Sequence, residues 1–312
     1  MPNSEFRIPK LFTLVGPTAV GKTEIALKLA REFLRIEHAG EIVSADSRTI
    51  YRGMDIATAK PTRAQQALAP HHLLDLVEPD EELTLADYQQ RAFAAIDAIF
   101  ARGKIPFLVG GTGLYVRAVV EGYRIPRVPP NMTRRAELEQ IPAPELYARL
   151  KTLDPEIAET ILPNNTRRMI RALEVIEATG EKMSEQQTRH PPPYAISQIG
   201  LSLPRPLLYE RVDARIEQMI ALGLEDEVRG LVARGYGFDL PSMTSLGYRE
   251  MGAYVRGEIS LDEAIALLKS NTRKFIRHQA NWFRPGDAQI HWFDLSVQNY
   301  DDIRAFVASQ LE

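Results

Sequence analysis

The hydrophobic positions of the first hundred residues predict strands that alternate with helices. Short apolar runs at 10–16, 41–46 and 106–111 each end at a glycine or a carboxylate and predict buried β-strands. A helical pattern extends over about 22–34. A longer amphipathic helix is expected at 85–103, where five apolar side chains fall on one face: Tyr88, Ala92, Ala95, Ile96 and Ile99. Because this alternation is typical of parallel sheets, we expect a doubly wound α/β fold.

The rest of the chain is mainly helical, with a change of pattern in its middle. Helical patterns without a convincing strand fill the stretch between two proline clusters, at residues 126, 129, 130 and 191–193. Proline clusters form semi-rigid boundaries. We therefore expect a small helical domain at 125–196, inserted into an α/β core that comprises 1–124 and 197–312. Two further strands of that core are expected at 197–203 and 290–295, followed by a helical C-terminal part.

The composition is that of a globular protein, and it excludes several kinds of chemistry. Charged residues make up 25% and hydrophobic residues 45% of the 312 residues, and the net charge is −3. The absence of cysteine excludes disulfide scaffolds, zinc ribbons, iron–sulfur clusters and cysteine nucleophiles. No apolar run approaches the ~18 residues of a membrane span, and the N-terminus carries no secretory signal, so we expect a cytoplasmic protein.

GPTAVGKT at 16–23 fits the phosphate-binding pattern G-x-x-x-x-G-K-[ST] and lies between a predicted strand and a predicted helix. In that context backbone N–H groups surround phosphate oxygens, aided by the helix dipole. Gly16 and Gly21 permit the turn, Lys22 reaches the phosphates, and the Thr23 hydroxyl coordinates Mg²⁺. The other loop positions of this pyrophosphate or nucleotide site are Pro17, Thr18, Ala19 and Val20. The loop does not identify the reaction, because a kinase, an NTPase and an enzyme using an organic pyrophosphate all need it.

Asp46 ends the second predicted strand, at the edge of the sheet where open α/β proteins bind ligands. Its carboxylate could hold Mg²⁺ or act as a general base, or it could only cap a turn. The polar run Ser47, Arg48 and Thr49 could face either a ligand or water. GGTGLY at 110–115 repeats the arrangement after the third strand, where a site loop and a plain strand–helix turn are equally good interpretations.

Three stretches concentrate positive charge although the whole chain is slightly acidic. In 264–286 the cations Lys269, Arg273 and Arg277 are spaced by four, so we expect them on one helix face. The opposite, packed face is expected to hold Ile265, Leu268, Phe275, Gln279 and Phe283. The other two stretches carry Arg124, Arg127, Arg134, Arg135, Arg167, Arg168 and Arg171. One basic face is most often only solvated, but three segregated ones make contact with a phosphate backbone a fair hypothesis.

Two pairs of residues leave their role open. Arg211 and Arg215 are four apart on a predicted helix, where either could reach a pyrophosphate as a planar cation. Either arginine could equally form a surface ion pair with Glu210, Asp213 or Glu217. From the residues alone we favour these surface ion pairs. His71 and His72 lack spaced partners for a metal site, so we favour a structural role for both.

Seven segments resemble the tRNA dimethylallyltransferases in order and spacing. They are GPTAVGKT (16–23), SADSRTIYRGMDIATAKP (44–61), PHHLLD (70–75), LVGGTGLY (108–115), NNTRRMIRALEV (164–175), LGYREM (246–251) and NTRKFIRHQANWFR (271–284). The resemblance covers nearly the whole chain. Val20 stands where serine is common in the family's loop. The zinc-finger extension of eukaryotic members is missing, so the chain resembles the bacterial form.

The resemblance implies a P-loop NTPase-like parallel sheet core, with an inserted helical domain that grips the anticodon stem-loop of tRNA. It implies transfer of a dimethylallyl group from dimethylallyl pyrophosphate to N6 of the adenosine next to the anticodon (position 37 of the tRNA), with release of pyrophosphate. Asp46 then matches the general base, Thr23 the Mg²⁺-associated residue and Arg215 a pyrophosphate-binding arginine. From the resemblance and the polar and basic stretches, the residues expected to contact tRNA are Asp46, Ser47, Arg48, Thr49, Thr112, Gly113, Arg135, Arg167, Arg168, Met169, Ile170, Arg171, Arg273 and Arg277.

Two other functions also account for part of the sequence. A P-loop kinase of a small metabolite explains the loop and Asp46, but it leaves the three basic stretches without a task. A non-catalytic, nucleotide-gated RNA-binding module explains the basic stretches, but it gives Asp46 no task. For the transferase, the expected partners are tRNA, dimethylallyl pyrophosphate and Mg²⁺, with no membrane and a monomeric chain.

Overall fold

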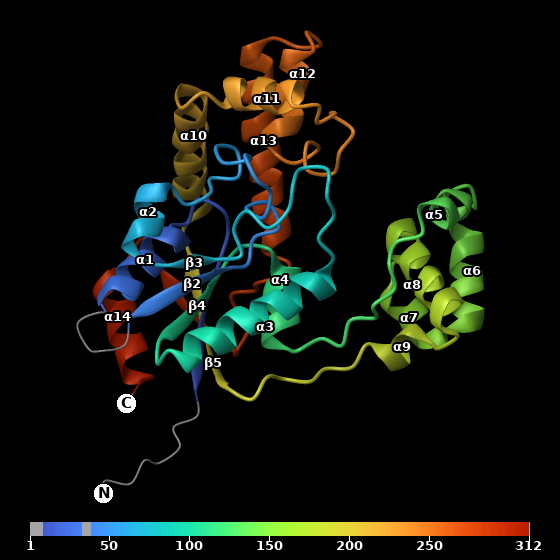
Figure 1. Ribbon diagram of the computed structural model, residues 1–312, viewed down its shortest axis with the longest axis horizontal. Coiled ribbons are helices and arrows are strands. Elements are labelled where there is room, and N and C mark those ends of the chain that lie inside the picture. The colour runs from blue at the N-terminus through green and yellow to red at the C-terminus, as the bar shows by residue number, and fades with distance from the viewer. Residues whose placement is uncertain (1–8, 33–38, 312) are drawn as a thin grey trace, which may run out of the picture. The chain divides into compact units, whose positions relative to one another are not determined.

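The computed structural model describes residues 9–32 and 39–311. Contacts divide the chain into two compact units: unit 1 comprises residues 1–117 and 193–312, and unit 2 comprises residues 118–192. Figure 1 shows the strands in unit 1 and a group of short helices in unit 2. Within the described ranges, none of the helices has the length and apolar character needed to cross a membrane.

A parallel sheet of six strands forms the centre of unit 1, in the order β3-β2-β4-β1-β5-β6. The strands are β1 (Lys10–Val15), β2 (Gly40–Ser44), β3 (His71–His72), β4 (Ile105–Val109), β5 (Ala195–Ser202) and β6 (Ile290–Asp294). The predicted parallel α/β fold is thereby confirmed. Only β3 was not predicted, because two residues are too short to give an apolar run. Leu14 and Ser44 both register with Val109, so the loops after β1, β2 and β4 leave from the same edge.

Helices flank this sheet and form the C-terminal part of unit 1. They are α1 (Lys22–Glu32), α2 (Arg63–Leu68), α3 (Leu85–Ala101), α4 (Gly113–Val120), α10 (Arg205–Ala221), α11 (Leu224–Ala233), α12 (Tyr248–Val255), α13 (Leu261–Gln279) and α14 (Tyr300–Ser309). Helix α4 continues into unit 2. The predicted end of the first helix near Leu34 lies outside the described residues. In α3 the predicted face is buried at Tyr88, Ala92, Ile96 and Ile99.

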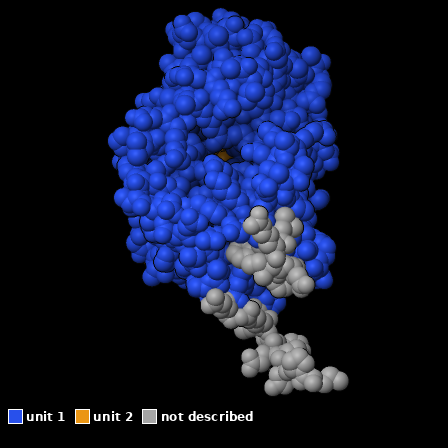
Figure 2. All heavy atoms as spheres, turned by 90° about the vertical axis from the view of Figure 1, so that its left-hand side faces the viewer, with its two compact units in different colours: residues 1–117, 193–312 blue, residues 118–192 orange. Residues whose placement is uncertain are grey.

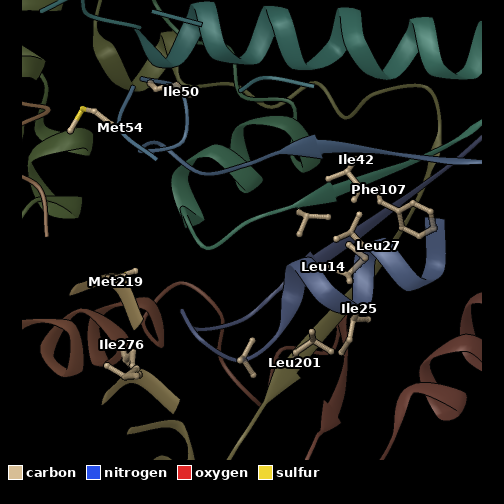
Figure 3. Close-up of a cluster of buried hydrophobic side chains, with 14 of the residues drawn as sticks. Leu14, Ile25, Leu27, Ile42, Ile50, Met54, Phe107, Leu201, Met219 and Ile276 are labelled. Carbon is tan, nitrogen blue, oxygen red and sulfur yellow. The ribbon is translucent and has the colours of Figure 1, made fainter. Parts of the chain in front are cut away.

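The core of unit 1 explains why the strands are apolar on both sides. Helices α1 and α3 both pack on β2 and β4, and Figure 3 shows them on opposite sides of the sheet. Leu14 and Phe107 are fully buried, and Leu27 of α1 points toward them. Each such side chain stabilises the fold by about 1.5–3 kcal/mol through its removal from water. This packing fixes the sheet edge from which the loops leave.

Unit 2 is helical throughout its described residues and has a core of its own. Its helices are α5 (Met132–Glu139), α6 (Ala143–Leu153), α7 (Pro155–Thr160), α8 (Thr166–Thr179) and α9 (Met183–Gln186). Apolar residues of α6 and α8, such as Leu146, Leu150 and Leu173, are buried against one another. Asn165 caps α8, because its side chain accepts a hydrogen bond from the amide of Arg168. Unit 2 spans 118–192, whereas the helical insertion was predicted at 125–196.

Candidate active site

The glycine-rich loop connects β1 to α1 in a conformation that most residues cannot adopt. Gly16 has φ +144°, and a Cβ there would lie 2.4 Å from the carbonyl oxygen of Leu201. Gly21 has φ +109°, and Ala19 also has a positive φ, of 63°. Glycine is therefore required at Gly16 for both conformation and space. The loop ends at the N-terminus of α1, where unpaired N–H groups and the helix dipole favour an anion.

Lys22 is the first residue of α1, and its amine lies against the loop. The Nζ atom donates to the carbonyl oxygens of Gly16 at 3.0 Å and Pro17 at 2.8 Å. Burial lowers the pKa of Lys22 to about 8, Asp46 opposes this effect and Arg215 adds to it. The three charged groups are therefore close enough to influence one another, as expected for a site that binds an anion beside a carboxylate.

Asp46 follows β2 and is held by its own turn. Its Oδ1 accepts a hydrogen bond of 2.8 Å from the backbone amide of Arg48, which defines an Asx turn. The Thr49 hydroxyl, which is buried, lies 3.0 Å from the Ser44 hydroxyl. The turn keeps the half-buried Asp46 carboxylate at the sheet edge. Asp46 therefore caps a turn and also remains available to the site.

The loop after β4 is joined directly to the Asp46 loop. The Ser47 amide donates to Thr112 Oγ1 at 3.0 Å, and the Thr112 amide donates to the Ala45 carbonyl at 3.3 Å. A Cβ at Gly110 would lie 2.0 Å from that same carbonyl oxygen, so only glycine permits this approach. The GGTG segment is therefore a tight strand–helix turn that also positions the residues beside Asp46.

Helix α10 supplies two arginines, and the surface pairing expected for them is wrong. Arg215 is mostly buried, which lowers its pKa, and Asp46 partly reverses that shift. The Arg211 guanidinium donates to the Val20 carbonyl of the glycine-rich loop at 3.2 Å. The neighbouring acids pair elsewhere: Asp213 with Arg273, and Glu217 with Lys269. Arg211 therefore contacts the loop, and Arg215 lies close enough to Lys22 and Asp46 to influence both charges.

One cavity of about 970 Å³ brings these groups together within unit 1. Its lining includes Lys22, Thr23, Asp46, Arg211 and Arg215. Figure 2 views unit 1 from the side of α1, α2 and α10 and shows its surface hollowed near the middle. The volume is at the upper end of the range for small-molecule sites, so a diphosphate donor and a second group can share it. The cavity places a phosphate loop and a carboxylate in one compartment.

Two features of the cavity region escaped prediction. Lys60 is 3% exposed, and its Nζ lies 2.6 Å from carboxylate oxygens of both Asp55 and Asp75 and 2.7 Å from the Tyr51 carbonyl. These contacts hold the segment that forms one wall of the cavity. In sequence, a lysine between Ala59 and Pro61 gives no sign that it is buried. Only the resemblance of residues 44–61 to a family motif drew attention to it.

The second feature is a pair of stacked tyrosines near Asp46. The rings of Tyr88 and Tyr115 have centroids 3.7 Å apart, and the Tyr88 hydroxyl donates to the Ser44 carbonyl at 3.0 Å. Burial raises the pKa of both hydroxyls, and Asp46 raises them further. From the sequence, Tyr88 was predicted only to lie on the packed face of a helix, so its position near Asp46 was missed.

His72 takes the structural role that we favoured, whereas His71 also lines the cavity. His72 Nε2 lies 2.6 Å from Glu41, and His71 Nδ1 lies 2.8 Å from the Ala69 carbonyl. Among the described residues no group of three or more His, Asp or Glu side chains could hold a metal. A Mg²⁺ ion needs few protein ligands when substrate phosphates and water complete its shell. The Thr23 hydroxyl, in the cavity wall, fits that mode of binding.

The basic face predicted for α13 is an interface between helices. Lys269 and Arg273 pair with Glu217 and Asp213 of α10, and Arg277 donates to the Tyr209 hydroxyl at 3.4 Å. The predicted packed face is also partly wrong, because Phe275 is 42% exposed whereas Leu268, Ile276 and Gln279 are buried. Acids on a neighbouring helix thus neutralise cations that appear free in the sequence.

Several expected RNA-binding residues of unit 2 are engaged within the protein. Glu174 accepts hydrogen bonds from Arg135 at 3.0 and 2.9 Å and from Arg171 at 2.6 Å. The side chains of Met169 and Ile170 are buried in the core, so they cannot present a surface to RNA. By contrast, the side chains of Arg167 and Arg168 are exposed at the start of α8.

Comparison with known proteins gives a consistent result. The family model described as IPP transferase matches residues 49–286. A tRNA dimethylallyltransferase from Roseiflexus sp. (strain RS-1) is 57% identical over 88% of this chain and 90% of its own length. One from Chloroflexus aggregans is 50% identical over 96% of this chain and 99% of its own.

Solved structures agree with these sequence matches. The full-length tRNA isopentenylpyrophosphate transferase from Bacillus halodurans is 41% identical, with a TM-score of 0.71 over 97% of this chain and 96% of that one. A eukaryotic dimethylallyltransferase acting on tRNA is 25% identical, with a TM-score of 0.80 over 97% of this chain and 79% of that one. The fold and the sequence thus point to one group of proteins.

Proposed function

This chain belongs to the IPP transferase family, and on that basis we propose that it transfers a dimethylallyl group from dimethylallyl pyrophosphate to N6 of the adenosine next to the anticodon of tRNA. The observation that carries the proposal is the shared cavity of Lys22, Thr23, Asp46 and Arg215. The relatives support this transfer and not the kinase alternative, because they are named as tRNA dimethylallyltransferases.

In the proposed reaction, Asp46 is the general base. The exocyclic amine of adenine is a poor nucleophile, because its lone pair is delocalised into the ring. N6 attacks the allylic C1 carbon, the C1–O bond breaks, and its electron pair leaves with pyrophosphate. The proton of N6 passes to the Asp46 carboxylate, which the Arg48 amide already holds in place.

The glycine-rich loop and two cations stabilise the leaving group in this proposal. Negative charge grows on the diphosphate as the C1–O bond breaks, and preorganised donors are most effective where charge develops. Lys22 and Arg215 both line the cavity, and Lys22 is the first residue of α1. Both cations are influenced by the charge of Asp46, so a diphosphate held by them would lie near the base.

Magnesium is the metal that we propose for this site. The Thr23 hydroxyl at the start of α1 would hold it together with oxygens of the diphosphate. When bound, the ion adds positive charge that stabilises the departing pyrophosphate. Asp46 remains available for proton transfer, because the proposal assigns it no metal.

We propose that tRNA binds through exposed cations and backbone groups of the described loops. Arg167 and Arg168 are exposed at the start of α8, and Arg48 is exposed beside Asp46. Two of the other residues expected to contact tRNA contribute less through their side chains. Thr49 is buried, and Arg273 is paired with Asp213. Turning the target base out of its stack costs a few kcal/mol, and least in a loop, which suits an anticodon-loop substrate.

One assay separates the three functions. The enzyme is incubated with unmodified tRNA, Mg²⁺ and either labelled dimethylallyl pyrophosphate or labelled ATP. We expect label from the prenyl donor in tRNA and released pyrophosphate. Consumption of ATP with a small acceptor would instead indicate a kinase, and binding of tRNA without turnover would indicate a non-catalytic module.

A further inference from the structure

Gln279 links two loops of the site although it lies at the far end of a long helix. It is the last residue of α13 and is 5% exposed. Its Oε1 accepts a hydrogen bond of 2.9 Å from the Thr18 amide of the glycine-rich loop. Its Nε2 donates at 3.0 Å to the Gly111 carbonyl, in the loop after β4. One side-chain amide therefore joins the loops that follow β1 and β4.

The fit around this amide is close. A Cβ at Gly111 would lie 2.4 Å from Gln279 Nε2, and a Cβ at Gly113 would lie 2.3 Å from Cγ of Trp282. The end of α13 and the turn after it thus lie directly on two glycines of the GGTG segment. Any side chain at Gly111 would displace the Gln279 amide, and any side chain at Gly113 would displace the Trp282 indole. The close packing of α13 on this loop therefore requires both glycines.

The link extends from the Gly111 loop to Asp46. Thr112 follows Gly111, and its hydroxyl accepts the Ser47 amide, while its own amide donates to the Ala45 carbonyl. Ala45 and Ser47 are the residues on either side of Asp46. A series of hydrogen bonds therefore runs from Thr18 through Gln279 and Thr112 to both neighbours of Asp46.

The chemistry of a glutamine suits this position. Its neutral amide offers one acceptor for the Thr18 N–H and one donor for the Gly111 carbonyl. A leucine would leave the Thr18 amide and the buried Gly111 carbonyl without this partner, at a cost in stability. An ionised glutamate would accept the hydrogen bond from the Thr18 amide. Its second oxygen, however, would face the Gly111 carbonyl oxygen. Its negative charge would also lie beside the glycine-rich loop, which is expected to bind an anion.

We propose that Gln279 is a positioning residue that holds the diphosphate loop in register with the loop that carries Asp46. The proposal rests on the proposed function. Gln279 does not touch the reacting atoms and acts through the Thr18 and Gly111 backbone. It sets the separation between donor and base, on which the reaction rate depends steeply.

The test compares Gln279→Leu, Gln279→Glu and Leu268→Ala in the transfer assay with labelled dimethylallyl pyrophosphate and tRNA. Leu268 is buried on the same helix, and its side chain cannot form hydrogen bonds to either loop. The Leu268→Ala variant therefore controls for a less stable α13. We expect Gln279→Leu to lower kcat by about 10²-fold, because misplacement of about 1 Å has effects of that size. Leu268→Ala is expected to lower thermal stability while kcat and KM stay near wild type.

The pH profile of Gln279→Glu provides a readout that a purely structural role would not change. A buried carboxyl facing a carbonyl oxygen has a raised pKa, so its protonated form grows as the pH falls. A protonated glutamate again offers one donor and one acceptor. We therefore expect the ratio of Gln279→Glu to wild-type activity to rise as the pH falls. The ratio is needed because pH also changes the activity of the wild-type enzyme.

Several results would overturn the proposal. Wild-type kcat in folded Gln279→Leu would do so, as would a pH-independent ratio for Gln279→Glu. A loss in Gln279→Leu no greater than that of Leu268→Ala at matched stability would also do so. If Gln279→Leu does not fold, Gln279→Asn replaces it, since its amide is one methylene too short to span both loops and the same loss is expected. A wild-type enzyme without transfer activity would contradict the proposed function itself, independently of Gln279.

Discussion

Among single residues, Asp46 has the most direct part in the proposed reaction. Its carboxylate is oriented by the Arg48 amide at 2.8 Å and lies in the cavity with Lys22 and Arg215. Asparagine keeps an acceptor for that amide, so it removes the basicity of the side chain without removing the turn. This allows proton transfer to be tested separately from loop structure.

We expect Asp46→Asn to lower turnover by about 10²–10⁴-fold, the usual contribution of a general base, with tRNA affinity within a few-fold of wild type. Single-turnover transfer and tRNA binding measure the two quantities. Asp294→Asn is the matched control, since Asp294 ends β6 and accepts a similar hydrogen bond of 2.9 Å from Ser296 but does not line the cavity. Unchanged turnover in Asp46→Asn would remove Asp46 from the mechanism.

Lys22 gives the donor site a pH dependence. Burial lowers its pKa to about 8, so the amine loses its proton as the pH rises through that value. The neutral amine no longer attracts the diphosphate, and kcat/KM for dimethylallyl pyrophosphate should fall above about pH 8. Arginine stays charged at that pH, so the fall in Lys22→Arg should move to higher pH. Identical alkaline limbs in both enzymes would show that Lys22 is not the group responsible.

How much of the site could be predicted differs between residues. Lys22 and Thr23 follow from a motif, and Asp46 follows from its place at the end of a strand. Arg215 was identified through the resemblance alone, because its local acids suggested surface pairs. Gln279 was placed on a packed helix face, since no local pattern shows that its amide bonds two loops far away in the sequence.

At the level of helices and strands, the role of the positive charges on α13 could not be predicted without knowing that α10 packs beside it. The stripe of Lys269 and Arg273 on α13 looked solvated, yet α10 supplies Glu217 and Asp213 to pair with it. Pairing between helices depends on tertiary packing, which sequence periodicity does not contain. Strands were easier to predict, because β1, β2 and β4 are buried on both faces and therefore read as continuous apolar runs.

Helix α8 carries the next prediction, which concerns RNA binding. Arg167→Ala and Arg168→Ala should each weaken tRNA binding and reduce the slope of log affinity against log salt by about 1. Arg134→Ala is the control, because Arg134 already pairs with Glu177 and Glu137 and has little charge to offer a phosphate. Binding titrations over a range of salt concentrations measure the slopes. Equal slopes in all variants would exclude Arg167 and Arg168 from phosphate contact.

The segment that contains Lys60 carries a prediction on stability. Lys60→Met should lower the free energy of unfolding by about 1–3 kcal/mol, because the Tyr51 carbonyl loses its buried partner. Lys28→Met is the control, since Lys28 forms only an exposed pair with Glu24 and should change stability by less than about 1 kcal/mol. Urea unfolding can be followed by the fluorescence of Trp282 and Trp292, both in unit 1. Equal stability of the two variants would show that the Lys60 contacts are dispensable.

At the scale of the whole molecule, the helical insertion was expected from proline clusters and from the loss of strand patterns. The fold divides at 118 and 192, with separate cores in the two units. The role of the insertion in RNA binding stays a prediction, as do a cytoplasmic location and a monomeric state. Size-exclusion chromatography with light scattering measures the last of these.

In the proposed complex, the glycine-rich loop holds the diphosphate of the donor while Asp46 faces the amine of the target adenine. A crystal structure of the enzyme with an unreactive thio analogue of dimethylallyl pyrophosphate and an anticodon stem-loop tests it most directly. We expect the diphosphate on residues 16–23 and the adenine N6 within about 3 Å of an Asp46 carboxylate oxygen. A diphosphate bound elsewhere, or an Asp46 carboxylate separated from the adenine by protein, would contradict it.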